Sequence, residues 1–291
     1  MRKRVHLVAL VVLVAFFAMT GQVFAAAKPA PTAPAPKAAS APVAGQSVSP
    51  VIDRIMAKKE LVVGTAGSMP PLNMTTKDGQ IIGFEADIAK IFASAMEVKL
   101  TLKSMHFDEL LPALEAGKID MVLSNMTMTP LRNLKVAFAG PYFESGKSIL
   151  AKKANVARLG SITDMNTPDK TLVALKGSTS QRFVEKLIPN AKLVLAEDYP
   201  QAVAMVREDK ALAMVADGPI CLVSVYRYPD AGLTTLDKPL SYEPIGVALP
   251  ANDPLLLNWL QNTILTIQKT GEMDILLQKW FKSAEWLKAL P

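Results

Sequence analysis

Residues 117–132 show the clearest pattern of apolar and polar positions in the chain. Apolar residues occupy every second position after Gly117, which predicts a short strand covered on at least one face. A polar loop, residues 125–129, follows. Thr129-Pro130 then has the composition of a helix N-cap with proline at the first helical position. The pattern predicts a strand, a polar loop and a helix in that order.

Strand-like and helix-like runs alternate along the rest of the chain after residue 50. Strands are expected at residues 60–67, 98–102, 170–175, 192–196, 211–216 and 245–249. Helices are expected at residues 51–59, 86–96, 109–116, 181–187, 201–208, 254–268 and 273–281. This alternation predicts an α/β fold with a parallel sheet and covered faces. Residues 68–72 contain two prolines and are expected to form a stiff loop without regular structure.

The loop 125–129 and the helix after it could form a small anion site. Its hydroxyls, amide and free backbone N–H groups are donors, and Arg132 lies one turn into the helix. A guanidinium can hold a carboxylate through two parallel hydrogen bonds. The alternative is an ordinary strand-loop-helix connection with a solvated arginine, and this stretch by itself does not decide between the two.

Two further positions carry polar groups at the end of an expected strand. Residues 177–180 open a helix after the strand 170–175, and the first N–H groups of a helix can bind an anion. The commoner reading is a capped helix with no ligand. Asp217 follows the strand 211–216, and ligands of open α/β sheets bind at this rim.

The N-terminus has the features of a secretory signal peptide. Three basic residues precede an apolar run and then small residues, so residues 1–26 are expected to be cleaved. Residues 27–48 consist mainly of Ala, Pro, Ser and Lys, which predicts a disordered, semi-extended linker. We expect the protein to be secreted.

Charge and composition exclude several classes of function. Five of the 32 basic residues lie in residues 1–48, and the remaining 27 nearly balance the 26 acidic residues. A protein that is nearly neutral after residue 48 is not expected to bind nucleic acid. Two histidines, one of them in the signal peptide, predict no metal cluster, and we expect no cofactor. Cys221 is the single cysteine and is expected to be a core thiol.

Several motifs together resemble the bacterial family-3 extracellular solute-binding proteins, which serve ABC importers of polar amino acids. The resemblance covers nearly all of residues 51–281. The motifs are GTAGSMPPL, IGFEADIAK, FDELLPALEAGKIDMVLSNMTMTPLR, FAGPY, LKGSTS, AMVADGP and GEMDILLQKWF. The resemblance implies a periplasmic-binding-protein-like fold, in which two α/β lobes joined by two hinge strands close on the ligand.

The resemblance also implies how the carboxylate of a ligand would be held. Arg132 would bind the α-carboxylate, and Asn125 and Thr127 would flank it. Thr179 and the backbone of Ser178 would close on the carboxylate from the second lobe.

The other end of the ligand would meet a second set of residues. Asp217 would take the α-ammonium, and Phe107 matches an aromatic residue that lines the ligand side chain. Met69 and Leu72 stand where the family usually has aromatic residues, and Ala66 stands where some members have a polar selector. This difference predicts an apolar ligand side chain.

The same resemblance divides the chain into lobes and gives it a partner. The first lobe would comprise residues 51–144 and 243–291, and the second lobe residues 145–242. The protein is expected to be a periplasmic monomer that delivers an amino acid, or a related small carboxylate, to an inner-membrane permease.

The main alternative is a secreted enzyme on the same scaffold, because similar proteins include enzymes like cyclohexadienyl dehydratase. A carboxylate in the cleft would then act as an acid or base. Glu144, Glu85 and Asp217 are the candidates, with His106 as another proton carrier. No set of nucleophile, base and orienting residue can be read from the sequence, so a binding protein is the preferred prediction.

Overall fold

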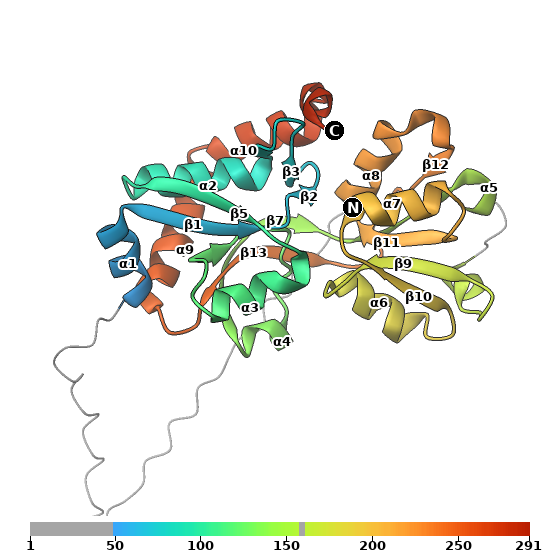
Figure 1. The fold of residues 1–291 in the computed structure, drawn as a ribbon, viewed down its shortest axis with the longest axis horizontal. Coiled ribbons are helices and arrows are strands. Elements are labelled where there is room, and N and C mark those ends of the chain that lie inside the picture. The colour runs from blue at the N-terminus through green and yellow to red at the C-terminus, as the bar shows by residue number, and fades with distance from the viewer. Residues whose placement is uncertain (1–48, 157–160) are drawn as a thin grey trace, which may run out of the picture. The chain divides into compact units, whose positions relative to one another are not determined.

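The computed structural model describes residues 49–156 and 161–291. The predicted signal peptide and linker, residues 1–48, lie outside the described residues. The described part contains two five-stranded sheets and one three-stranded sheet (Figure 1). We call the five-stranded sheet that contains β1, with its helices, the first lobe. The other five-stranded sheet and its helices form the second lobe.

The sheet of the first lobe has the strand order β5-β1-β6-β13-β7. β1 runs parallel to β5 and β6, as the alternating pattern predicts, whereas β13 runs antiparallel to both β6 and β7. The bounds are β1 Glu60–Thr65, β5 Lys99–Ser104, β6 Met121–Val122, β7 Val136–Ser145 and β13 Glu243–Pro250. Its helices are α1 Pro50–Lys58, α2 Phe84–Ala95, α3 Leu110–Glu115, α4 Pro130–Asn133, α9 Pro254–Lys269 and α10 Glu272–Leu277.

The sheet of the second lobe has the strand order β10-β9-β11-β8-β12. β9 is parallel to β10 and β11, and β8 is antiparallel to β11 and β12. The bounds are β8 Lys147–Lys152, β9 Thr171–Leu175, β10 Lys192–Ala196, β11 Ala213–Asp217 and β12 Leu233–Thr234. Its helices are α5 Lys153–Val156, α6 Thr179–Leu187, α7 Tyr199–Arg207 and α8 Gly218–Arg227, with 3₁₀ turns at Ile162–Met165 and Pro229–Ala231.

Each sheet is covered by helices whose apolar faces complete its core. Leu61 and Val63 of β1 are fully buried in one cluster with Ile88 and Phe92 of α2. Residues of β9, β11 and α6 form a separate cluster in the second lobe. Cys221 is buried and free of a disulfide, as the sequence predicts. No helix in residues 49–156 or 161–291 is long and apolar enough to span a membrane.

The expectation of a loop without regular structure at residues 68–72 is wrong in part. Ser68–Met69 is strand β2, which pairs with β3 Asn73–Thr75, and β3 in turn pairs with β4 Ile81–Ile82. The two prolines follow β2 rather than interrupt it, so they remove no N–H group that the β2–β3 pairing needs. Residues 70–72 form the turn of this small hairpin.

The chain crosses between the two large sheets at Gly146, and it returns between β12 and β13. The two crossings lie side by side, because Ser145 of β7 pairs with Glu243 of β13. A Cβ atom at Gly146 would clash with the carbonyl oxygen of Ser241, so the close approach of the two crossings needs glycine there.

The C-terminal segment is fastened to the first lobe through Asp87 of α2. Its carboxylate accepts hydrogen bonds from Lys279 Nζ at 2.6 Å and from Trp280 Nε1 at 2.9 Å. Both donors lie in a π-helical stretch, Gln278–Lys282, that continues α10. A 3₁₀ turn, Glu285–Ala289, then brings the chain end to the cavity described below. The expected single helix at 273–281 is therefore two consecutive helical segments.

Candidate functional site

Arg132 is held at the start of α4, as the sequence predicts. Thr129 is the N-cap, and its hydroxyl accepts a hydrogen bond from the Arg132 N–H at 3.2 Å. Pro130 occupies the first helical position, where a missing N–H costs nothing. These two residues are a local signal, and they fix the position from which the guanidinium points back over the loop.

The guanidinium of Arg132 contacts both lobes but pairs with no acid. It donates to Thr127 O at 2.9 Å in the first lobe and to Gly177 O at 3.2 Å in the second. Its Cζ atom lies 5.6 Å from the ring centroid of Phe107. Arg132 is only 8% exposed, and it takes part in none of the ion pairs found among residues 49–156 and 161–291.

Burial makes the charged form of Arg132 less favourable than it is in water. Burial, followed by the nearby charge of Arg182, lowers the pKa of Arg132 to about 10, while Glu243 and Asp217 act in the opposite direction. A buried cation is stable when an anion is paired with it. Because no side chain of the described residues supplies that anion, the site is suited to a ligand carboxylate.

Asn125 connects the loop of the first lobe to the second lobe. Its backbone is left-handed, with φ at +48°, and its N–H donates to Glu85 Oε1 at 2.6 Å. Its Nδ2 donates to Asp217 Oδ2 at 2.5 Å, whereas its Oδ1 is buried and has no hydrogen-bond partner in the described structure. Backbone strain of this kind is typical of functional sites. The unpaired Oδ1 is an acceptor available to an N–H or O–H group of a ligand.

The second lobe presents the helix start that the sequence singles out. Ser178 caps α6 by accepting from Gln181 N at 3.1 Å, and it donates to Leu175 O at 2.6 Å. Thr179 lies 3.3 Å from Thr127 between hydroxyl oxygens, and its hydroxyl donates to Glu243 Oε2 at 3.1 Å. Thr127 and Thr179 therefore meet across the two lobes.

Asp217 ends β11 and is buried beside the same loop. Its Oδ1 accepts from Lys147 Nζ at 2.7 Å, and Lys147 Nζ also lies 3.5 Å from Glu243 Oε2. Sequence reasoning singled out neither Lys147 nor Glu243. Both lie at the chain crossings, far in sequence from Asp217. The only local signal was a charged residue at the first position of an apolar strand, as Lys147 is in KSILA.

Glu85 is buried against the loop 125–129, and its carboxylate accepts hydrogen bonds only from uncharged groups. Asn73 Nδ2 donates to it at 2.5 Å, the Asn125 N–H at 2.6 Å, and Tyr142 through its hydroxyl. Burial raises the pKa of Glu85, and these three hydrogen bonds lower it less than burial raises it. Glu85 thus stabilises the conformation of the loop through the N–H group of Asn125.

We expect Glu85→Gln to flatten the dependence of stability on pH. A carboxyl group whose pKa is raised on folding favours the folded state at low pH, and this contribution is lost as pH rises above the unfolded value of 4.5. Glutamine does not titrate, so the free energy of unfolding should fall less between about pH 5 and about pH 8 than in the wild type. Chemical denaturation across this range measures the slope. Glu144→Gln, which removes an exposed carboxylate that accepts from Tyr242, is the matched control. An unchanged slope in Glu85→Gln would contradict the assignment.

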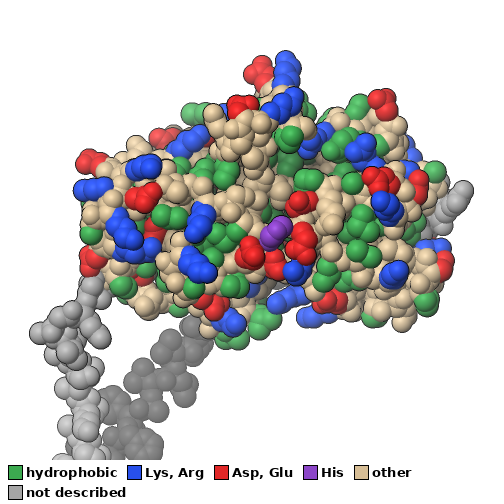
Figure 2. Space-filling view, in the orientation of Figure 1, with side chains coloured by type: hydrophobic (Ala, Val, Ile, Leu, Met, Phe, Trp, Pro, Cys, Tyr) green, Lys and Arg blue, Asp and Glu red, His purple; other side chains and the backbone are tan. Residues whose placement is uncertain are grey.

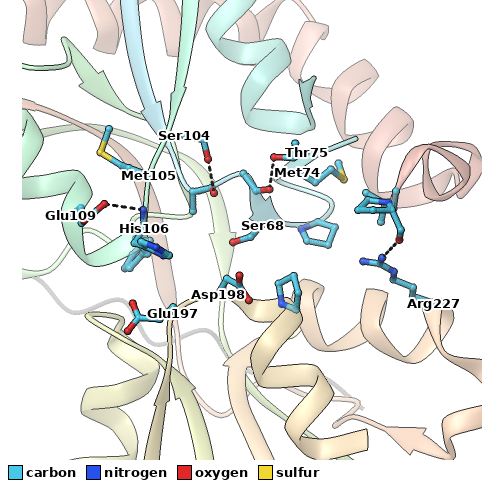
Figure 3. Close-up of a pocket in the computed structure, with 17 residues that line it drawn as sticks. Ser68, Met74, Thr75, Ser104, Met105, His106, Glu109, Glu197, Asp198 and Arg227 are labelled. Carbon is cyan, nitrogen blue, oxygen red and sulfur yellow. Dashed lines mark hydrogen bonds between the residues drawn. The ribbon is translucent and has the colours of Figure 1, made fainter. Parts of the chain in front are cut away.

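Phe107 also lines a cavity of about 510 Å³, which Figure 3 shows between the two lobes. It is lined from the first lobe by residues around Ser68 and His106, and from the second lobe by Glu197, Asp198 and Arg227. Glu109 adds a third carboxylate to the lining. The acidic side chains gather around the junction of the lobes on the face shown in Figure 2. The cavity could receive the side chain of a ligand whose carboxylate is at Arg132.

Met69 and Leu72 lie elsewhere than the sequence suggests. They are 1% and 0% exposed, belong to the core of the first lobe and do not line this cavity. The Ser124 hydroxyl lies 3.8 Å from Met69 Sδ and covers it. Contact of either residue with a ligand therefore stays a prediction, one that would need the core to open. Phe107 is buried and lies beside both Arg132 and the cavity.

The residues considered for acid or base chemistry are mostly engaged structurally. Glu144 is exposed and accepts a hydrogen bond from Tyr242 at 3.0 Å. His106 is exposed and forms a capping box with Glu109 at the 3₁₀ turn Phe107–Glu109. No group of three or more His, Cys, Asp or Glu residues in the described ranges could hold a metal ion.

These features define a two-lobed binding protein in which a buried arginine and a buried aspartate are both hydrogen-bonded to the loop 125–129. The family model of bacterial extracellular solute-binding proteins, family 3, matches residues 61–283, and the chain belongs to this family. The family and fold predicted from the sequence are thereby confirmed.

Three proteins similar to this chain are named for a bound amino acid or for amino-acid binding. The ABC transporter arginine-binding protein 1 of Escherichia coli (strain K12) is 25% identical over 228 residues, which cover 77% of this chain and 92% of that protein. A putative ABC transporter binding component from Wolinella succinogenes, complexed with lysine, is 36% identical with a TM-score of 0.75, covering 79% and 99% of the two chains. The ancestral amino acid-binding protein AncCDT-1, described as a precursor of cyclohexadienyl dehydratase, is also 36% identical, with a TM-score of 0.73 and coverage of 79% and 99%.

Proposed function

We propose that this protein captures an amino acid between its lobes by pairing the ligand carboxylate with Arg132, and delivers it to an ABC permease of the inner membrane. One observation carries the proposal. Arg132 is buried, and its guanidinium forms hydrogen bonds in the described structure only to two carbonyl oxygens, one from each lobe. A carboxylate would satisfy its charge and its planar fork together. The protein would act in the periplasm as a monomer.

The remaining site residues would complete the recognition of the α-carbon groups. Thr127, Thr179 and the N–H groups at Ser178 would add donors to the carboxylate. Asn125 Oδ1 and Asp217 would accept from the α-ammonium. The lobes that close on the ligand would comprise residues 51–144 with 243–291, and residues 145–242.

We further propose that the ligand side chain is cationic. The support is the lining of the 510 Å³ cavity, in which the carboxylates of Glu109, Glu197 and Asp198 outnumber the one guanidinium, that of Arg227. Lys176 pairs with Glu197 at 3.4 Å, so Glu109 and Asp198 are the carboxylates without an ion pair among the described residues. Asp198 uses one carboxylate oxygen to cap α7, accepting from Gln201 N at 2.7 Å, and forms no ion pair among the described residues. The expectation of an apolar side chain depends on Met69 and Leu72, which are in the core, and on Ala66, which does line the cavity. The arginine and lysine named for two relatives agree with a basic ligand.

Titration calorimetry with L-arginine, L-lysine, L-glutamine and L-leucine tests both parts of the proposal. We expect the two basic amino acids to bind most tightly. In thermal unfolding, a ligand at about 100 times its Kd should add roughly 2.7 kcal/mol to stability. Tightest binding of L-leucine would contradict the cationic side chain and restore the apolar pocket. Binding of none of the four would contradict amino-acid capture itself.

We propose that the protein is a binding protein and not an enzyme, although the scaffold is shared with a precursor of cyclohexadienyl dehydratase. The support is that Glu144 and His106 are exposed and Glu85 is held by three neutral donors. Incubation with prephenate or arogenate should give no product above the uncatalysed rate. Turnover that disappears in Asp217→Asn would instead support the enzyme.

A further inference from the structure

Lys147 is a buried lysine at the point where the chain enters the second lobe. It is the first residue of β8 and is directly opposite Asp217, the last residue of β11. Only 1% of its surface is exposed, and its Nζ lies 2.7 Å from Asp217 Oδ1 and 3.5 Å from Glu243 Oε2. We call Lys147, Asp217 and Glu243 the charge cluster. One ammonium between two carboxylates leaves the cluster with one negative charge in excess.

The charge cluster extends into the proposed ligand site. Asp217 Oδ2 accepts from Asn125 Nδ2, and Glu243 Oε2 accepts from the Thr179 hydroxyl. The unpaired Asn125 Oδ1 belongs to the same side chain that contacts Asp217. The excess negative charge therefore lies among the groups that would receive the α-ammonium.

The charges at the two ends of the site then match those of an amino acid. Arg132 contributes one unpaired positive charge, and the charge cluster contributes one net negative charge. In a buried site, charges are screened far less than in water, so an uncompensated unit charge has a large effect on affinity. A zwitterion at the α-carbon would neutralise both ends.

We propose that Lys147 determines specificity by setting the net charge of the ammonium-binding end to minus one. The inference rests on the proposed function, since it concerns the same site. Lys147 acts through Asp217 and Glu243 and need not touch the ligand. Without its ammonium the cluster would carry two negative charges. Without the Glu243 carboxylate the cluster would be neutral.

The test compares a ligand that has an α-amine with one that lacks it. L-arginine and its des-amino analogue, 5-guanidinopentanoate, share the carboxylate and the side chain. Calorimetry gives the ratio of their affinities in the wild type, Lys147→Met, Glu243→Gln and the double variant. A 1.4 kcal/mol change in differential binding is a tenfold change in this ratio.

We expect the two single variants to move the ratio in opposite directions. Lys147→Met should raise the preference for L-arginine by about tenfold or more, and Glu243→Gln should lower it by about tenfold or more. The double variant restores a net charge of minus one, so its ratio should return to within about threefold of the wild type. If Lys147→Met does not fold, Glu243→Gln and the double variant still carry the comparison.

A purely structural role for Lys147 predicts another result. Loss of packing would weaken both ligands alike and leave the ratio unchanged in all three variants, which would overturn the inference. Lys152→Met is the matched control. Lys152 lies on the same strand and pairs with Asp209, an exposed residue outside the cluster. A different result, in which the wild type binds neither L-arginine nor the des-amino analogue, would contradict the proposed function itself.

Discussion

Replacing Arg132 with lysine is expected to weaken amino-acid binding by roughly 2 to 5 kcal/mol, which is at least about 30-fold in Kd. The lysine keeps the charge but loses the planar fork, so it cannot hold a carboxylate through two parallel hydrogen bonds. A single ammonium nitrogen would also have to replace the two guanidinium nitrogens that now donate to Thr127 O and Gly177 O, one in each lobe. Arg132→Ala should lose as much or more.

Calorimetry with L-arginine measures the effect, and Arg182 provides a matched control. Arg182 lines a cavity together with Arg132 but is exposed. Arg182→Lys should change the Kd by less than about threefold, because an exposed charge is screened by solvent and salt. Circular dichroism establishes that each variant is folded. Near-normal affinity in Arg132→Lys would rule out the carboxylate assignment.

The part of the site that could be predicted from the sequence is the part fixed by local signals. Thr129 and Pro130 determine where α4 begins, and this start fixes the position of Arg132. The strand before it is shorter than the apolar alternation suggests, because only Met121–Val122 pairs as a strand. Asp120, just before it, contacts β1 twice: its N–H donates to Val62 O at 2.8 Å, and its carboxylate accepts from Val62 N at 2.7 Å. Local pattern thus located the element, while tertiary hydrogen bonding set its length.

The lining of the cavity could not be predicted in this way. Met69 stands where the family usually has an aromatic residue. It is nevertheless buried in the core, in strand β2, which pairs with β3. Glu197 and Asp198 line the cavity from the second lobe and lie about 130 positions after Met69 in the chain. Side-chain periodicity describes a single element and carries no information about which distant element will face it.

The ion pairs around Asp217 could not be predicted from local sequence patterns either. Asp217 could be predicted as a rim residue from its place after a strand, but its partner Lys147 lies 70 positions earlier. An isolated lysine in an apolar strand is a weak signal, because it could equally mark an exposed edge. Only the antiparallel pairing of β8 with β11 shows that the ammonium is buried against the carboxylate.

Asp217→Asn is expected to have the second large effect on binding, and the loss should depend on the α-amine of the ligand. Asp217 uses Oδ1 for Lys147 and presents Oδ2 beside Asn125. An asparagine can still accept one hydrogen bond but carries no charge. The charge cluster would then be neutral, with Lys147 paired to Glu243 alone, and nothing at this end would attract an ammonium.

We therefore expect the variant to bind L-arginine on the order of 2 to 5 kcal/mol more weakly, and 5-guanidinopentanoate by less than about 1 kcal/mol. The des-amino analogue keeps the contact with Arg132 and brings no ammonium, so the charge on Asp217 contributes little to its binding. Asp209→Asn is the control, since Asp209 is an exposed carboxylate that also pairs with a lysine of β8. An equal loss for both ligands would mean that Asp217 maintains the shape of the second lobe. A loss confined to L-arginine would identify Asp217 as the group that recognises the amine.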